Sequence, residues 1–223
     1  MNNKTEKDFN LFRKDMGISG TALHDYQGIL DGYINPTIIE ERQLNVAQLD
    51  VFSRLMMDRI IFLGTAIDDT VSNIITAQLL YLSSVDSSTP IQLYLNSPGG
   101  GIYAGFSVLD TMNFIEPDVN TMVTGMAASM AFILAISGKK RSALKHSRLM
   151  SHQPLGGAHG QASDIQIVAK QIELLKNELY DIIVNKTGQT LEKVTVDCDR
   201  DYWMTSSEAL DYHAIDSIVG IDK

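Results

Sequence analysis

The sequence predicts an α/β protein in which a mainly parallel sheet is covered by helices. Short apolar runs alternate along the chain with stretches whose apolar residues recur every three or four positions. The links between them are short, and several of the apolar runs end in polar or glycine-rich turns. This alternation is typical of β-α units, whose strands lie parallel because each helix carries the chain back across the sheet.

The composition is that of an ordinary globular protein. The 223 residues suffice for one domain with a substantial core, and 44% are hydrophobic and 20% charged. The formal net charge of −9 disfavours a protein that binds nucleic acid or anionic membranes. Cys198 is the single cysteine, which excludes an internal disulfide and a cysteine metal cluster. It fits the reducing cytoplasm, where we expect the protein, and no metal site is predicted.

The chain divides into an N-terminal arm over 1–35 and one domain over 36–223. Residues 1–35 are polar, keep no sustained apolar period and contain no apolar stretch like that of a secretory signal. We interpret them as an arm or a propeptide. The most apolar segment, 123–137, is shorter than the roughly 18 to 20 residues that a membrane span needs.

The first elements of the domain follow from spacing. A helix is predicted over 46–58, where Leu49, Phe52 and Leu55 keep a three-residue spacing. The same reasoning predicts a strand over 59–64, a helix over 70–82, a strand over 91–96, a helix over 102–115 and a strand over 119–124.

The second half of the domain begins with the apolar stretch GMAASMAFILAISG at 125–138, interpreted as a glycine turn and a buried helix. A strand over 147–152 and a long helix over 163–186 follow, and Gly188 suits the C-terminal cap of that helix. The letters TSSE at 205–208 form a capping box, in which the Thr and Glu side chains each bond the other's backbone N–H, and predict a short helix.

Three predicted strands end at Asn96, Thr124 and His152. In open parallel sheets, ligands bind outside the carboxyl ends of the strands. We therefore expect the segments SPGGG, GMAAS and HQPLGG to lie together on one rim of the sheet. That rim is the candidate functional site.

Ser129 stands at the predicted start of the buried helix. Free backbone N–H groups and the positive end of the helix dipole favour, at such a place, a nucleophile whose attack creates an oxyanion. The stretch G-M-A-A-S differs from the esterase elbow G-x-S-x-G. A serine at a helix start also serves as a plain N-cap, and this stretch alone does not choose between the two roles.

His152 lies where a proton acceptor for such a nucleophile is needed, because imidazole gains and loses a proton near neutral pH. An ordinary surface histidine fits the position as well. A histidine base also needs a carboxylate on its other ring nitrogen. The segment DCDRDYW offers Asp197, Asp199 and Asp201, and spacing does not choose among them. A solvated acidic turn with Arg200 paired locally is the alternative.

The glycines of NSPGGG, residues 96–101, allow backbone N–H groups to approach an anion closely. No G-K-[ST] follows, so the segment is not a Walker-type phosphate loop. It is suited to one half of an oxyanion hole, although a plain strand-to-helix turn explains it too.

The motifs YLNSPGG, DTMNFIEPDV, GMAASM, HQPLGGAHGQASDI and TGQTLEKVTVDCDRDYWMTSSEALDYHAID make the sequence similar to the proteolytic subunits of the Clp protease (ClpP) family, which are serine peptidases. The resemblance runs from about Pro36 to Val219. It implies a ClpP/crotonase-like fold of repeated β-α units with a protruding long-helix handle at about 153–187.

The resemblance assigns the catalytic nucleophile to Ser129, the general base to His152 and the third triad member to Asp201. The oxyanion donors of the family fall on the backbone N–H groups of Gly100 and Met130. The implied reaction is the hydrolysis of unfolded polypeptides by acyl transfer, with no cofactor.

The resemblance also implies partners. The family forms two stacked heptameric rings around a chamber, and a hexameric Clp-class ATPase, such as the ClpX or the ClpA/ClpC type, binds the ATP and feeds unfolded chains into it. Asp199 and Arg200 match a pair that couples ring-to-ring contact to active-site order. Tyr94 and Phe114 fall on positions of the ATPase docking pocket.

Two other functions differ in class from this one. A crotonase-type acyl-CoA enzyme has a related fold and an oxyanion hole but does not need a Ser–His–Asp set. An inactive ring subunit would have lost triad members, and this chain keeps all three.

Three positions depart from the family pattern: Ala131 replaces a common glycine, Ser151 replaces a bulky aliphatic residue, and Gln92 replaces an aromatic docking residue.

Overall fold

A computed structural model describes residues 37–42 and 45–220 of the chain. The chain forms two compact units, one that ends at Arg54 and one that begins at Leu55. The arm predicted over 1–35 lies outside the described residues.

The first unit contains a two-stranded hairpin. Strands β1 (Thr37–Arg42) and β2 (Asn45–Asp50) pair antiparallel along their full length, and α3 (Val51–Met57) follows. The prediction of one helix over 46–58 is therefore wrong for its first five residues. Asp50 marks the boundary, because its carboxylate accepts the backbone N–H of Ser53 at 3.0 Å and so caps the helix.

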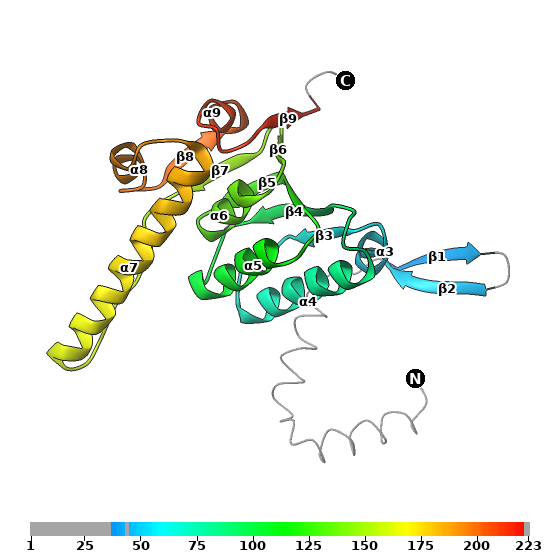
Figure 1. Ribbon diagram of the computed structural model, residues 1–223, viewed down its shortest axis with the longest axis horizontal. Coiled ribbons are helices and arrows are strands. Elements are labelled where there is room, and N and C mark those ends of the chain that lie inside the picture. The colour runs from blue at the N-terminus through cyan, green and yellow to red at the C-terminus, as the bar shows by residue number, and fades with distance from the viewer. Residues whose placement is uncertain (1–36, 43–44, 221–223) are drawn as a thin grey trace, which may run out of the picture. The chain divides into compact units, whose positions relative to one another are not determined.

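The second unit is built on a mainly parallel sheet, as predicted (Figure 1). Its hydrogen-bonded path runs β3-β4-β5-β6-β9, and β7 pairs parallel with β5 and antiparallel with β8. Strands β6, β8 and β9 were not predicted. The strands are β3 (Ile60–Leu63), β4 (Ile91–Ser97), β5 (Val119–Ala128), β6 (Arg141–Leu144), β7 (Arg148–Ser151), β8 (Tyr202–Thr205) and β9 (Ser217–Val219).

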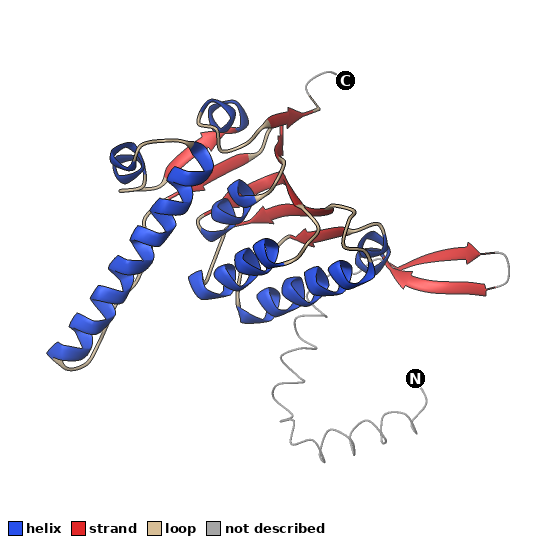
Figure 2. Cartoon of the chain, in the orientation of Figure 1, coloured by secondary structure: helices blue, strands red, loops and turns tan. Residues whose placement is uncertain are grey.

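Helices cover one face of this sheet (Figure 2). Strands β3 to β6 lie in chain order, so right-handed crossovers put the three helices between them on the same side. The helices of the unit after α3 are α4 (Asp69–Val85), α5 (Ile102–Phe114), α6 (Met130–Ser137), α7 (Ala162–Thr187), α8 (Leu191–Asp197) and α9 (Ser206–Asp211).

Alternation along β4 shows how the core forms. Ile91, Leu93 and Leu95 are fully buried beneath the helices, whereas Gln92 and Tyr94 point to the other face and are half-buried. Helix α6 differs, because each of its eight residues is buried. The apolar run that contains it is therefore a core helix, and among the described residues no helix has both the length and the hydropathy needed to cross a membrane.

Helix α7 is packed over only part of its length. Its buried side chains all lie in the C-terminal half, from Leu175 onward, and the N-terminal half extends away from the sheet in Figure 1. Gly188 ends the helix in the left-handed conformation, with φ 71°. The predicted helix over 163–186 and its glycine cap are confirmed. So is the capping box at the start of α9, formed by Thr205 and Glu208.

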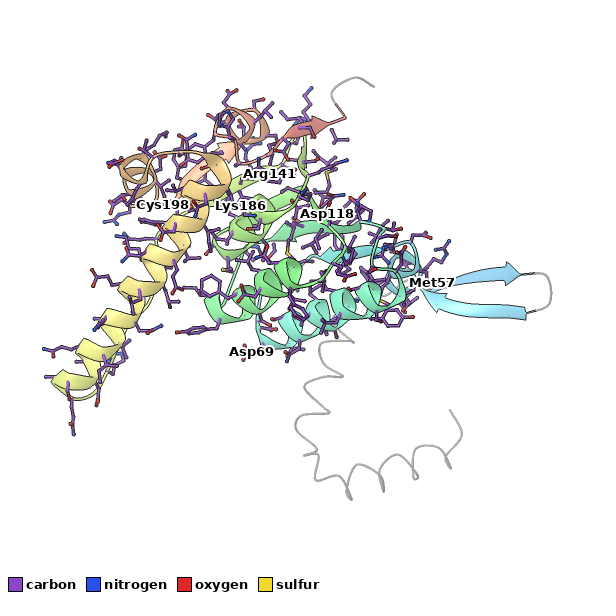
Figure 3. The ribbon with its side chains drawn as sticks, viewed as in Figure 1. Met57, Asp69, Asp118, Arg141, Lys186 and Cys198 are labelled. Atoms are coloured by element: carbon purple, nitrogen blue, oxygen red, sulfur yellow. The ribbon has the colours of Figure 1, made fainter. Side chains whose placement is uncertain are left out.

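Arg141 joins the start of β6 to two neighbouring elements. Its guanidinium bonds the carboxylate of Asp216, and its Nη1 donates to the carbonyls of Lys186 at 2.7 Å and His213 at 2.9 Å. Figure 3 labels Arg141 and Lys186, which border a cavity of about 440 Å³ that Asp118 also lines. Partial burial would raise the pKa of Asp216, but the hydrogen bonds and charge of Arg141 outweigh it and hold that pKa below its ordinary value.

Replacement of Arg141 by Met is expected to lower the free energy of unfolding by about 1–3 kcal/mol, because two carbonyls and a half-exposed carboxylate lose a charged donor. Because the pKa of Asp216 is lowered in the folded protein, the ion pair stabilises the fold fully at pH values above the ordinary Asp pKa of about 3.9. That stabilisation is lost as the pH falls through the lowered value. Denaturant unfolding should therefore show a deficit at pH 7 that shrinks below about pH 4.

Lys140→Met is the matched control, because the Lys140 side chain is exposed and forms no hydrogen bond within the described part of the chain. We expect it to stay within about 0.5 kcal/mol of the wild-type protein. A deficit of Arg141→Met that is the same at every pH would show that its pairing with Asp216 contributes nothing.

Candidate active site

Ser129 occupies a strained turn between β5 and α6. Its backbone has φ 55° and ψ −123°, a positive-φ conformation that costs a non-glycine residue about 1–3 kcal/mol. Its side chain makes no capping hydrogen bond, so the interpretation of Ser129 as a plain N-cap is wrong. Strain of this kind at a strand-to-helix turn exposes a nucleophile in other folds, even though the G-x-S-x-G letters are absent here.

Packing on both sides holds the strained turn in place. The backbone N–H of Ser129 donates to the carbonyl of Met150 in β7 at 2.9 Å, and its carbonyl accepts the N–H of Phe132 at 3.0 Å. Before it, Ala127 and Ala128 pair with β7, and after it comes the fully buried helix α6. The apolar run thus anchors Ser129 at the sheet edge.

His152 follows the last residue of β7 and meets Ser129 directly. Its Nε2 lies 2.9 Å from Ser129 Oγ. The two residues come together because β5 and β7 are adjacent parallel strands, in register at Ala128 opposite Met150, and both end on the same rim. The side chain of His152 is only 15% exposed, so the contact is partly shielded from water.

The other ring nitrogen of His152 meets Asp201. Its Nδ1 lies 2.9 Å from Asp201 Oδ1. The antiparallel pairing of β7 with β8 sets Ser151 opposite Tyr202, and one more step of that register brings His152 opposite Asp201. Spacing along the sequence could not reveal this, because 49 residues separate the pair.

The two other candidate carboxylates point elsewhere. Asp197 accepts hydrogen bonds from Lys193 Nζ at 2.7 Å and from the Tyr212 hydroxyl at 2.9 Å. Asp199 is exposed and lies 3.7 Å from the guanidinium of Arg200. Only Asp201 of these three forms a hydrogen bond with His152 within the described residues.

Together the three side chains form a continuous hydrogen-bonded series. With the proton on Nδ1, His152 donates to the Asp201 carboxylate and its Nε2 accepts the hydroxyl proton of Ser129. This tautomer can remove that proton as the hydroxyl oxygen attacks an electrophile. The arrangement is suited to acyl transfer.

The glycine turn after β4 lies directly against Ser129. Gly99 has φ 91°, and a Cβ atom added there would lie 2.4 Å from the Ala128 carbonyl oxygen and 2.9 Å from the Met130 nitrogen. The backbone of Ile67 holds the turn from the outside, because its N–H donates to Gly99 and its carbonyl accepts from Gly101. The turn, the strained serine and the start of α6 are therefore in contact, as the predicted rim requires.

The backbone N–H groups of Gly100 and Met130 have no hydrogen-bond acceptor within the described residues. Gly100 is exposed, and the neighbouring Gly99 contacts Met130. N–H groups that no internal carbonyl uses are free to donate to an anion. These two are the donors that the sequence analysis assigned.

Gly125 has a different role from the one expected. The sequence analysis made it the turn before the helix, but β5 continues through it to Ala128. A Cβ atom on Gly125 would lie 2.5 Å from the side-chain oxygen of Asn96, which accepts the N–H of Met126 at 3.1 Å. Gly125 thus leaves room for Asn96 where the pairing of β4 and β5 becomes irregular.

Several assigned or neighbouring residues stand outside the triad. Tyr94 lies on the sheet face opposite the helices, whereas Phe114 ends α5 on the helix side and is 80% exposed. Within one chain, Tyr94 and Phe114 therefore belong to different layers.

Gln153 was not among the predicted site residues. Its side chain donates a hydrogen bond to the Asp199 carbonyl at 2.9 Å. Its position next to His152 was the only signal in the sequence that could have identified it.

No cluster of His, Cys, Asp or Glu side chains in the described part of the chain could hold a metal ion. The candidate site therefore consists of the triad and the two backbone N–H groups. Whatever else it binds must reach Ser129 from the rim.

Comparisons with known proteins give the family. The family model described as Clp protease matches residues 42–222. The chain is 60% identical over 208 residues to the ATP-dependent Clp protease proteolytic subunit of Porphyromonas gingivalis (strain ATCC BAA-308 / W83), with 92% of this chain and 94% of the relative covered. It is 59% identical over 208 residues, with the same coverage, to the protein of that name from Bacteroides fragilis (strain YCH46). Subunit 1 from Shouchella clausii (strain KSM-K16) is 47% identical over 188 residues, which cover 83% of this chain and 97% of the relative.

Replacement of Gly99 by Ala is expected to lower the free energy of unfolding by about 3 kcal/mol or more, because its φ disfavours a side chain and the new Cβ would collide with backbone. Gly157→Ala is the control, since nothing lies within 4 Å of a Cβ there, and it should change stability by less than about 0.5 kcal/mol. Thermal unfolding of both variants measures the difference. Equal stability of the two variants would contradict the described contact between the glycine turn and Ser129.

Proposed function

Since the chain belongs to the Clp protease family, we propose that it is a serine endopeptidase subunit with Ser129 as nucleophile, His152 as general base and Asp201 as the third triad member. The hydrogen-bonded series from Ser129 Oγ through the imidazole to Asp201 carries this proposal. The reaction needs no cofactor in this proposal, because the triad supplies both the nucleophile and the proton acceptor.

The proposed reaction proceeds in two halves. Ser129 Oγ attacks the carbonyl carbon of a peptide bond while His152 Nε2 takes its proton, and the imidazolium then gives that proton to the leaving amine. Water, activated by the same imidazole, hydrolyses the acyl-serine that remains. Asp201 keeps Nδ1 protonated and stabilises the imidazolium.

The N–H groups of Gly100 and Met130 are the proposed oxyanion donors. Two observations support this role: neither group has an acceptor among the described residues, and the glycine turn contacts Met130. Each such donor typically contributes about 3–4 kcal/mol to transition-state stabilisation. The N-terminus of α6 adds its dipole in the same place.

We propose assembly into two stacked heptameric rings, joined through the N-terminal half of α7. That half buries no side chain in the single chain, yet it exposes Ile165, Ile167, Val168 and Leu174. Exposed apolar residues on a projecting helix favour contact with another subunit. The exposed pair of Asp199 and Arg200, near Asp201, is suited to couple that contact to the triad.

We also propose that a hexameric Clp-class ATPase of the cytoplasm feeds unfolded polypeptides to this peptidase. The relatives are named ATP-dependent Clp protease proteolytic subunits. Exposed Phe114 and half-buried Tyr94 are the proposed docking residues. Because the two lie in different layers of one chain, a pocket that uses both would need neighbouring subunits.

Ser129→Ala is expected to lower cleavage of a fluorogenic peptide by about 10⁴-fold or more, because the nucleophile is lost. Sedimentation should give the same assembly as the wild-type protein. Reaction with a serine-directed fluorophosphonate probe should label the wild-type chain at Ser129, which distinguishes a peptidase from a crotonase-type enzyme. Retained cleavage by the purified variant would refute the mechanism.

Asp201→Asn is expected to lower kcat by roughly 10³- to 10⁴-fold, because an amide can stabilise the wrong tautomer of His152 and not the imidazolium. Asp197→Asn is the matched control in the same acidic segment, since Asp197 bonds Lys193 and Tyr212 instead. It should keep kcat within about threefold of the wild-type value. Similar losses in both variants would show that Asp201 has no special role.

A further inference from the structure

Besides the bond from the Gln153 side chain to the Asp199 carbonyl, two hydrogen bonds at Cys198 join the end of β7 to the turn before Asp201. Ser151 Oγ lies 3.0 Å from Cys198 Sγ, and the backbone N–H of Gln153 donates to the Cys198 carbonyl at 2.7 Å. Ser151 and Gln153 are the two neighbours of His152, and Cys198 precedes Asp201 by three residues. The two chain segments that carry the base and its carboxylate are therefore fastened to each other at Cys198.

The Ser151–Cys198 bond is buried. Ser151 is 4% exposed and Cys198 1% exposed, so water does not compete for the bond. Figure 3 labels Cys198 beside α8, whose C-terminal cap it forms. Burial raises the pKa of the Cys198 thiol, so the thiol stays protonated at neutral pH. It can then donate a hydrogen bond to the Ser151 hydroxyl or accept one from it.

The backbone on both sides of Asp201 sets its position: the pairing of Tyr202 with Ser151 follows it, and this junction precedes it. Its side chain is 60% exposed and forms a hydrogen bond only with His152 among the described residues. No other side chain holds the carboxylate, so the backbone that leads to it must set its distance from the ring. A backbone shift of about 1 Å at such a place can cost up to 10²-fold in rate.

We propose that Ser151 and Cys198 are positioning residues of the peptidase. Together with the pairing of β7 and β8, their buried bond keeps the turn that carries Asp201 at hydrogen-bond distance from His152, and so it raises kcat without contact with the substrate. This inference rests on the function proposed above.

Cys198→Ala is the first test, in the assembled full-length protein with a fluorogenic peptide. We expect kcat to fall about tenfold with KM unchanged, because the loss falls on the proton transfer and the Gln153 backbone bond remains. Cys198→Ser keeps a hydrogen-bonding group and should restore kcat to within about twofold of the wild-type value. A wild-type kcat in Cys198→Ala would overturn the proposal.

The double variant Ser151→Ala/Cys198→Ala separates positioning from stability. Cys198→Ala alone strands a buried hydroxyl and should lower Tm by several degrees, whereas removal of both polar groups should recover most of that loss. The reduced kcat should persist in the double variant. If kcat recovered together with Tm, the role of the pair would be only structural and the proposal would be wrong.

Ser147→Ala is the matched control, because Ser147 precedes β7 at its opposite end and is equally buried. Its hydroxyl donates to the Val123 carbonyl at 2.9 Å. We expect a loss in Tm with kcat unchanged, and a tenfold loss of kcat here would contradict the special role of Ser151 and Cys198. Failure of the peptidase function itself would look different, since the wild-type chain would then not cleave the peptide.

Discussion

The change of partner along β5 is the constraint on which the site depends. Thr121 to Val123 pair with β6, and Met126 to Ala128 pair with β7. Only the second pairing puts Ser129 beside the strand that leads to His152. Strand β8 then pairs antiparallel with β7 and brings its preceding residue, Asp201, to the same ring. Backbone hydrogen bonds thus fix three side chains that are distant in sequence.

Both local backbone hydrogen bonds and the buried interior support the strain at Ser129. Its positive-φ backbone costs about 1–3 kcal/mol, and the fully buried α6 offsets that cost many times over. The same compactness requires glycine at Gly99 and Gly125, where any side chain would collide with the neighbouring strand end. The apolar run and the glycines therefore act together: they make the edge of the sheet rigid and hold the Ser129 hydroxyl in place there.

Much of the fold could be predicted from periodicity. Local signals in the sequence predicted helix α7 with its Gly188 cap and the capping box at Thr205. They also predicted the strands β3 to β5 and the helices between them. The helix predicted over 46–58 failed because strand pairing between β1 and β2 overrides local spacing. Strands β6, β8 and β9 were not predicted, because each has only three or four residues and none is an uninterrupted apolar run like β3.

The amino-acid pattern was enough to predict the fold class, the rim on which polar strand ends gather, and, through its motifs, the family. Spacing alone left Asp197, Asp199 and Asp201 open, and only the family resemblance pointed to Asp201. Neither could reveal the strain at Ser129 or the contact of Cys198 with Ser151. Tertiary structure decided those points. The reason is physical: a side chain's chemistry depends on its neighbours in space, and strand register, not chain distance, brings those neighbours together.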